Sequence, residues 1–359
     1  MADTTQTNES APSGGGFSIL SLFRRPEAGA AAGFILIFLF FAWFGWEKNF
    51  LTALGSSTWL NFASKVGIIA IPIGFLMIAG ELDISVGALI PAGGIVLAMG
   101  VELYGLNIWL ACFMSLTVAG AIGYINGMIV TRTNVPSLIV TLATLFVIAG
   151  LNAYISKQLA GTTQHSLQDV GPVSEFLMGD YHSLILGEGD GAITIFRSLQ
   201  SSFFIWLVFA VVCFYILHIS PWGNWIFAMG GDQESARNAG IPTNRLKIAL
   251  FMLSAMSAAL VGMTEAVLAN TASTTTQFGM IFNTIICVVV GGVLLTGGFG
   301  TVTGTVFGTL TFGIVFQGIN FTTFDKDLNL LFIGVLLLVA VLMNDTFRNI
   351  ATSASTKKK

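Results

Sequence analysis

The chain has 359 residues, of which 54% are hydrophobic and only 9% are charged. Soluble domains carry roughly 25% charged residues, so this sequence cannot cover an ordinary water-exposed surface and must be solvated largely by lipid. The net charge of −3, without a basic patch or arm, argues against nucleic acid as a partner.

Motifs for catalysis, nucleotide binding and metal binding are absent from the sequence, which contains no Walker A, H-E-x-x-H or G-x-S-x-G pattern. The three cysteines, Cys112, Cys213 and Cys287, lie in apolar runs without C-x-x-C spacing, so we expect small buried side chains. The sequence therefore predicts no catalytic residue, no cofactor and no metal site. Any energy that the protein uses must come from a partner or from an ion gradient.

Residues 1–28 are expected to form a cytoplasmic tail, in which residues 1–16 are polar and lack the early positive charge and apolar core of a signal peptide. Within it, residues 17–23 are amphipathic and are followed by Arg24 and Arg25. Two alternatives are open: an interfacial helix on the cytoplasmic leaflet, or an irregular tail with one apolar patch.

A membrane span needs about 20 mainly apolar residues, because about 1.5 Å per residue must cross about 30 Å of hydrocarbon. By this criterion about ten runs predict an all-α polytopic membrane protein, with a transmembrane domain at 29–345 and a cytoplasmic tail at 346–359. The run at 281–295 is short and precedes a glycine-rich stretch, which indicates a broken or re-entrant helix. The runs are 29–45, 59–80, 84–101, 108–131, 135–156, 203–219, 246–268, 281–295, 301–321 and 328–342.

The distribution of basic residues predicts the orientation. With the N-terminus inside, ten of the 15 basic residues lie on the inner side and five lie outside. Both termini are then cytoplasmic, and the loop 157–200 is extracytoplasmic.

The segment 80–87 places two carboxylates beside hydrocarbon, where an Asp near a helix centre costs about 3 kcal/mol. Either Asp83 caps a helix that begins at Ile84, assisted by Ser85, or a discontinuous helix lines a translocation path. Polar residues such as Asn126 can instead join neighbouring helices by hydrogen bonds. The candidate path residues are Glu81, Asp83, Ser85, Asn126, Thr141 and Thr144.

The polar segment 230–242 interrupts two apolar runs and predicts one small helix. Asp232 can cap its start, and Gly240 can end it in the left-handed conformation before Pro242. A capped helix with Glu234 and Arg237 on its surface is typical of a docking element, so we define a cytoplasmic coupling segment at 221–245. Its candidate contact residues are Asp232, Glu234, Ala236, Arg237 and Gly240.

Three glycines, Gly300, Gly304 and Gly308, recur at intervals of four residues. On a helix they form one smooth stripe that lets a second helix approach closely. The spacing of Gly80 and Gly87 is repeated by Gly297 and Gly304, which hints at an internal repeat.

Four segments together resemble the permease subunits of the bacterial sugar ABC importers, the family of ribose, xylose and arabinose permeases. Residues 81–87 are similar to the family's Asp-Leu-Ser-Val-Gly stretch, with Ile84 in place of leucine. Residues 136–145 resemble its Pro-x-x-Ile-x-Thr-Leu-Gly-Thr-Leu stretch, with Ala143 where glycine is usual. Residues 231–241 resemble its cytoplasmic coupling segment, and residues 297–308 resemble its late glycine-rich run.

The resemblance implies the ABC importer permease fold, a location in the bacterial inner (plasma) membrane, and a monosaccharide-type solute. It implies a cytoplasmic ATPase subunit docked on 231–240, a periplasmic solute-binding protein at the outer face, and a second permease subunit, most simply a homodimer, all in membrane lipid. ATP hydrolysis would then belong to the partner, and this chain would not be an enzyme.

Two alternatives are open. An ABC permease for a nucleoside or a signalling sugar would carry the same motifs. An ion-coupled secondary transporter would instead require charged relay pairs deep in the spans and no docking helix. The few intramembrane carboxylates lie near span ends, which counts against this second alternative.

Overall fold

The computed structural model describes residues 26–167, 170–179, 181–186, 193–336 and 338–339. The amphipathic segment 17–23 and the tail 346–359 lie outside the described residues. The helices are α2 (Pro26–Phe44), α3 (Ala53–Ile78), α4 (Val86–Glu102), α5 (Ile108–Arg132), α6 (Ser137–Ala160), α7 (Pro172–Ser174), α8 (Ser201–His218), α9 (Pro221–Gly231), α10 (Gln233–Asn238), α11 (Thr243–Ala269), α12 (Phe278–Val290) and α13 (Val302–Gly318). Short helical turns lie at Trp46–Lys48, Glu175–Gly179, Ile319–Phe321 and Lys326–Leu328, and residues 329–336 are helical.

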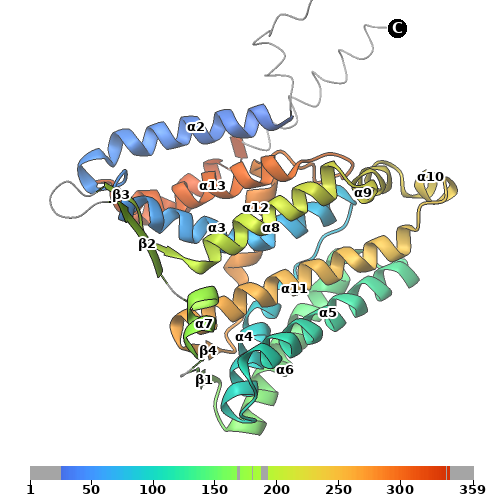
Figure 1. The fold of residues 1–359 in the computed structure, drawn as a ribbon. Helices are drawn as coiled ribbons and strands as arrows, with labels where there is room; N and C mark the ends of the chain where they lie inside the picture. Colours follow the sequence, from blue (N-terminus) through green and yellow to red (C-terminus); the bar gives the residue numbers. More distant parts are fainter. Residues whose placement is uncertain (1–25, 168–169, 180, 187–192, 337, 340–359) are drawn as a thin grey trace, which may run out of the picture.

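The predicted fold class is confirmed, because apolar helices form most of the described chain (Figure 1). Among the described residues, six helices are long and apolar enough to cross a membrane: α3, α5, α6, α8, α11 and α13 with its last turn. Three apolar helices are shorter, at residues 29–44, in α4 and in α12. The predicted count of ten spans is not confirmed, and the run 328–342 extends beyond the described residues.

The helix α3 forms the centre of the bundle. In its most apolar window 89% of the residues are buried, against 22% in α6 and 28% in α8. The exposed side chains of α6 and α8 are mostly large and apolar, which suits contact with lipid or with another membrane subunit. Pro72 within α3 and Pro91 within α4 are tolerated because neighbouring helices surround them.

Local sequence signals set several helix ends. The side chains of Thr52, Asn107 and Thr301 accept hydrogen bonds from backbone N–H groups in the first turns of α3, α5 and α13. Gly161 and Asn270 adopt the left-handed conformation directly after α6 and α11 and so end these helices.

Four short strands add two antiparallel pairs to this helical fold. The strand β1 (Gln164–Ser166) pairs with β4 (Thr271–Ser273), and β2 (Tyr181–Leu186) pairs with β3 (Ile193–Gln200). They lie at one end of the bundle, on the left in Figure 1, while α9 and α10 lie at the other. We call these ends the strand end and the α10 end.

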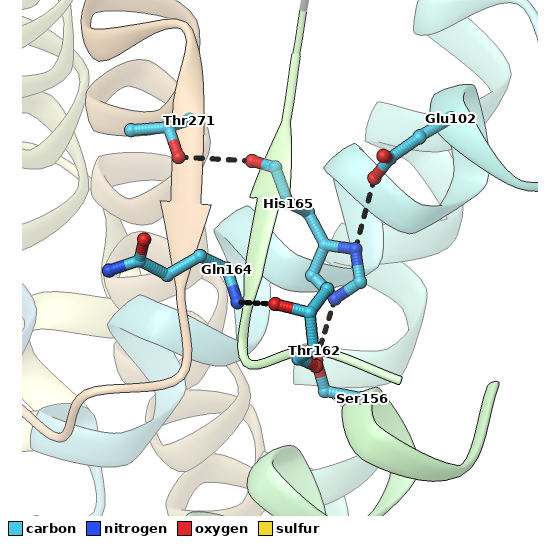
Figure 2. A network of polar contacts seen from close by, with 6 residues as sticks. All are labelled: Glu102, Ser156, Thr162, Gln164, His165 and Thr271. Carbon is cyan, nitrogen blue, oxygen red and sulfur yellow. Dashed lines mark hydrogen bonds and ion pairs between the residues drawn. The ribbon is translucent and has the colours of Figure 1, made fainter. Parts of the chain in front are cut away.

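A buried histidine holds β1 against the helices at the strand end (Figure 2). His165 Nε2 lies 2.6 Å from the Ser156 hydroxyl on α6, and Nδ1 lies 3.0 Å from the Glu102 carboxylate on α4. The Thr271 hydroxyl on β4 donates to the His165 carbonyl oxygen at 3.1 Å. One side chain and its backbone therefore fasten the ends of α4, α6 and α11 together.

Two short helices interrupt the bundle in the same way. The pairs α3–α4 and α11–α12 each consist of a long helix, a left-handed residue (Gly80 or Asn270), an extended segment and a short helix. The start of α12 meets the start of α4, where the Gln277 N–H donates to the Gly87 carbonyl at 2.9 Å. From there α4 runs to the strand end and α12 runs toward the start of α13.

This arrangement differs from the repeat that glycine spacing hinted at. Gly87 lies in the first turn of α4, where an added Cβ would lie 2.7 Å from Ile281. Gly304 instead lies in α13 against Gly291. The similar succession relates α3–α4–α5 to α11–α12–α13, so the glycine spacing did not identify it. Such opposed short helices are typical of transport proteins.

Candidate functional site

The coupling segment folds as α9 and α10 at the α10 end, where α10 projects at the right-hand edge of Figure 1. As the sequence predicted, Asp232 caps α10. Its Oδ1 accepts hydrogen bonds from the N–H groups of Glu234 (2.9 Å) and Ser235 (3.1 Å), and its Oδ2 accepts one from the Ser235 hydroxyl (2.9 Å). The hydrogen bonds from the Ser235 N–H and hydroxyl, together with that from Glu234, hold the pKa of Asp232 below its usual value.

The other end of α10 closes as predicted. Gly240 has a φ of 87°, its N–H donates to the Arg237 carbonyl, and the Ile241 N–H donates to the Ala236 carbonyl at 3.1 Å. This pair of bonds is the Schellman motif, in which a left-handed residue satisfies the last carbonyls of a helix. A helix of only six residues is thus fixed at both ends by its own sequence.

The exposed face of α10 carries Glu234 and Arg237, both solvent-exposed. Ala236 is different: it is only 4% exposed and points into the protein. We therefore correct its role, because a buried methyl group anchors α10 and cannot belong to the docking face. Gly240 likewise has a structural role, because its left-handed conformation ends α10.

Close backbone contacts fix α9 against the core. The Gly298 N–H donates to the Ile78 carbonyl at the end of α3, at 2.8 Å. A Cβ added to Gly230 would overlap this carbonyl, and one added to Gly297 would lie 3.2 Å from Gly80. Glycine is required here because three chain segments meet backbone to backbone.

A buried lysine connects α10 to the segment between α3 and α4. Lys247, in the second turn of α11, is 6% exposed and forms an ion pair with Glu81. Its ammonium also donates to the Gln233 side-chain oxygen at 2.7 Å. In the sequence, Lys247 contributed only as one of the ten basic residues on the predicted inner side. A lysine just before the apolar stretch of α11 was the available signal, but its partners lie 14 and 166 residues away.

The candidate path residues gather around the start of α4. Asp83 is fully buried; its Oδ1 accepts from the Ser85 N–H and hydroxyl, and its Oδ2 accepts from the Ser254 hydroxyl on α11 at 2.9 Å. The Asn126 side chain donates to the Ser85 hydroxyl at 3.2 Å and accepts from Thr144 at 2.6 Å. We call Asp83, Ser85, Asn126, Thr144 and Ser254 the buried polar network.

The capping role expected for Asp83 is wrong. The helix α4 begins at Val86, two residues later than expected, and the side chain of its N-cap residue Ser85 makes no capping bond. Asp83 instead satisfies the backbone of Ser85 and joins α4 to α11. Sequence reasoning missed Ser254, since nothing local distinguishes it from other helical serines.

The helix α6 satisfies the extended backbone beside the network. The Ser137 hydroxyl accepts from the Leu82 N–H at 3.1 Å, and the Thr141 hydroxyl accepts from the Ile84 N–H at 3.3 Å. Thr141 is fully buried, whereas Thr144 is partly exposed. The predicted path residues therefore share one region, where most of them bind one another or the backbone.

The glycine stripe is confirmed in part. Gly304 and Gly308 on α13 face the end of α12, where an added Cβ would overlap the Gly291 and Cys287 carbonyl oxygens, respectively. Gly300 precedes α13 and contacts Val293 and Ile78, so it does not belong to the helical stripe. Cys287, like Cys112 and Cys213, is buried and free. Among the described residues, no group of three or more His, Cys, Asp or Glu side chains could hold a metal ion.

A bundle of apolar helices, broken at a buried polar network and carrying a capped helix at one end, defines a multi-pass membrane transport component. The family model described as "Branched-chain amino acid transport system / permease component" matches residues 55–341. The chain belongs to this family of ABC transporter permeases. No solved structure matches it.

Curated relatives place the chain among the sugar permeases of this family. It is 30% identical to the L-arabinose ABC transporter permease protein AraH of Azospirillum brasilense, over 84% of this chain and 83% of that protein. It is 28% identical to the fructose import permease protein FrcC of Rhizobium meliloti, over 84% and 81%. It is also 28% identical to the ribose import permease protein RbsC of Escherichia coli K12, over 83% and 88%. These relatives are permease subunits, so the chain is a permease subunit and not itself an enzyme.

Proposed function

We propose that this chain forms the translocation path of an ATP-binding-cassette importer for a monosaccharide-type solute in a bacterial inner membrane, powered by a separate ATPase subunit. The exposed helix α10 is the observation that carries this proposal. Its ends are fixed by Asp232 and by the Gly240 turn, and it presents Glu234 and Arg237 to solvent. A loop that only joined α9 to α11 would need neither a cap nor an exposed charged face.

The two ends of the bundle then have different partners. The ATPase docks on α10 in the cytoplasm, together with both chain termini, and a periplasmic solute-binding protein docks at the strand end. Two copies of the chain enclose the path in a homodimer. The names of the relatives, which import arabinose, fructose and ribose, support a monosaccharide as the solute.

We place the path beside the buried polar network, along the face of α6 that carries the partly exposed Thr144. Asp83 of the network, together with Ser137 and Thr141 on α6, keeps the extended segment 80–85 hydrogen-bonded within the membrane, which a broken helix requires. The solute itself would meet few fixed partners there, so selection would fall to the binding protein.

Reconstitution tests the proposal. The chain, its co-purified ATPase and the binding protein are placed in liposomes, and uptake of radiolabelled ribose, arabinose and fructose is measured with and without internal ATP. We expect ATP-dependent uptake of a monosaccharide that persists when ionophores collapse all ion gradients. Uptake of nucleosides alone would change the solute class. Uptake by the chain without an ATPase, abolished by ionophores, would establish the ion-coupled alternative and contradict the proposal.

A further inference from the structure

Lys247 contacts both the coupling helix and the broken α3–α4 region. Lys247 belongs to α11 and is only 6% exposed. Its ammonium has two polar partners, Gln233 on α10 and Glu81 in the segment before α4. The described residues contain two ion pairs between a lysine and a glutamate, and only Lys247–Glu81 contacts the coupling segment. It therefore provides a direct polar connection between α10 and the interior at this end.

The connection continues inward from Glu81. The Glu81 N–H donates to the Leu76 carbonyl at 2.8 Å, so Glu81 is held at the end of α3. Two residues further on, Asp83 binds Ser85 and Ser254 within the buried polar network. Only the short backbone segment 81–83 separates the ion pair from this network.

Burial makes this connection stiff. The side chains of Lys247 and Glu81 are only 7% and 10% exposed, so separating them would leave two charges with little access to water. An ammonium has three N–H donors, and two of them already serve Glu81 and Gln233. A displacement of α10 must move Lys247 and Glu81 with it or break the Gln233 contact.

We propose that Lys247 is a positioning residue that transmits the movement of α10 to the α3–α4 segment, through its contacts to Gln233 and Glu81. This inference rests on the proposed function, since it presumes that an ATPase moves α10. It adds a role for Lys247, Gln233 and Glu81, which all lie outside the docking face of Glu234 and Arg237.

The test measures transport and ATP hydrolysis together, in liposomes that contain the complete importer. Gln233→Ala removes the contact to α10 and leaves the buried ion pair intact, so it keeps the chain folded. Lys247→Arg preserves the charge and can still donate to both partners, and Asn134→Ala removes an exposed amide between α5 and α6, outside the coupling segment, as a matched control. The thermal stability of each variant in detergent is recorded alongside.

For Gln233→Ala we expect the solute transported per ATP hydrolysed to fall about fivefold or more, a ratio typical of lost allosteric coupling. The ATPase rate and thermal stability should stay at the level of wild type, and Lys247→Arg and Asn134→Ala should keep the wild-type ratio of transport to hydrolysis. A merely structural contact would lower stability without changing the ratio of transport to hydrolysis.

Two results would overturn the inference while wild type still transports. The first is an unchanged ratio in Gln233→Ala. The second is an equal loss of hydrolysis and transport, which would make Gln233 part of the docking face. Absence of ATP-dependent transport in wild type would instead overturn the proposed function, and the inference with it.

Lys247→Met, which leaves Glu81 unpaired, should lower the ratio of transport to hydrolysis further than Gln233→Ala does.

Discussion

The hydroxyl of Ser254 donates a 2.9 Å hydrogen bond to Oδ2 of Asp83, across 171 residues of sequence. Both side chains are fully buried, and the bond joins the extended segment before α4 to the middle of α11. It is the contact that closes the buried polar network between the first and second halves of the chain.

We expect Ser254→Ala to lower the stability of the folded protein by about 1–3 kcal/mol, because it leaves a buried carboxylate oxygen without its donor. Ser257→Ala is the matched control: its hydroxyl is equally buried but bonds only to the Ser254 carbonyl in its own helix. Thermal unfolding in detergent, followed by size-exclusion chromatography, measures both. Equal losses of stability in the two variants would show that the hydrogen bond to Asp83 contributes no more than a bond within one helix.

The packing of α13 against α12 makes a second prediction. In Gly308→Ala the new methyl group would overlap the Cys287 carbonyl, so we expect a loss of about 1–3 kcal/mol from overpacking. Gly279→Ala in α12 meets no atom within 4 Å, so it should be neutral or stabilise by about 0.4–1 kcal/mol. The same unfolding assay separates them. A Gly308→Ala protein as stable as wild type would mean that the two helices are not in contact there.

The cap of α10 should respond to pH. The hydrogen bonds of Ser235 and Glu234 lower the folded-state pKa of Asp232 below its unfolded value of about 3.9. The carboxylate therefore stabilises α10 fully above that value, and this contribution is lost as the pH falls through the folded-state pKa. Hydrogen exchange of the α10 amides, followed across acidic pH, should show this loss relative to the intrinsic exchange rate.

Asp232→Asn provides the control for this measurement. Asparagine caps helices about as well as aspartate but does not titrate, so its α10 protection should not change over the same pH range. If wild type and Asp232→Asn lose protection in parallel, another group is responsible.

The histidine at the strand end supports a fourth prediction. His165→Ala removes both side-chain bonds shown in Figure 2 and should destabilise the β1–β4 pair by about 1–3 kcal/mol. Hydrogen exchange at residues 164–166 and 271–273 should then accelerate. Gln164→Ala, whose side chain on the same strand is exposed, should leave the exchange unchanged. Equal exchange in both variants would contradict the fastening role of His165.

Much of the fold could be predicted from hydropathy, because lipid requires long apolar helices. The caps of α10 were also predictable, since Asp232 and Gly240 act on backbone groups within a few residues. The start of α4 was misplaced because Asp83 binds Ser254, a partner far away in sequence. The β1–β4 pair was missed because both strands are three residues long and the pair joins two loops that are distant in sequence.

The candidate site was predicted unevenly for a similar reason. Sequence reasoning selected polar residues that interrupt apolar runs, and the structure does bring Asp83, Ser85, Asn126 and Thr144 together. It could not identify Lys247 as the partner of Glu81, because spacing along a chain does not reveal which helices pack. Ala236 was assigned to the docking face because a helix of six residues has too little periodicity to show which side is buried.

The central claim is that the exposed face of α10 receives an ATPase, and affinity purification from native membranes tests it most directly. Wild type and the double variant Glu234→Lys/Arg237→Glu are each tagged, solubilised in mild detergent and purified with their partners. We predict that an ATPase subunit co-purifies in stoichiometric amount with wild type and is lost from the double variant, which stays inserted and dimeric. Equal recovery of the ATPase with both proteins, or of no ATPase with wild type, would contradict the account.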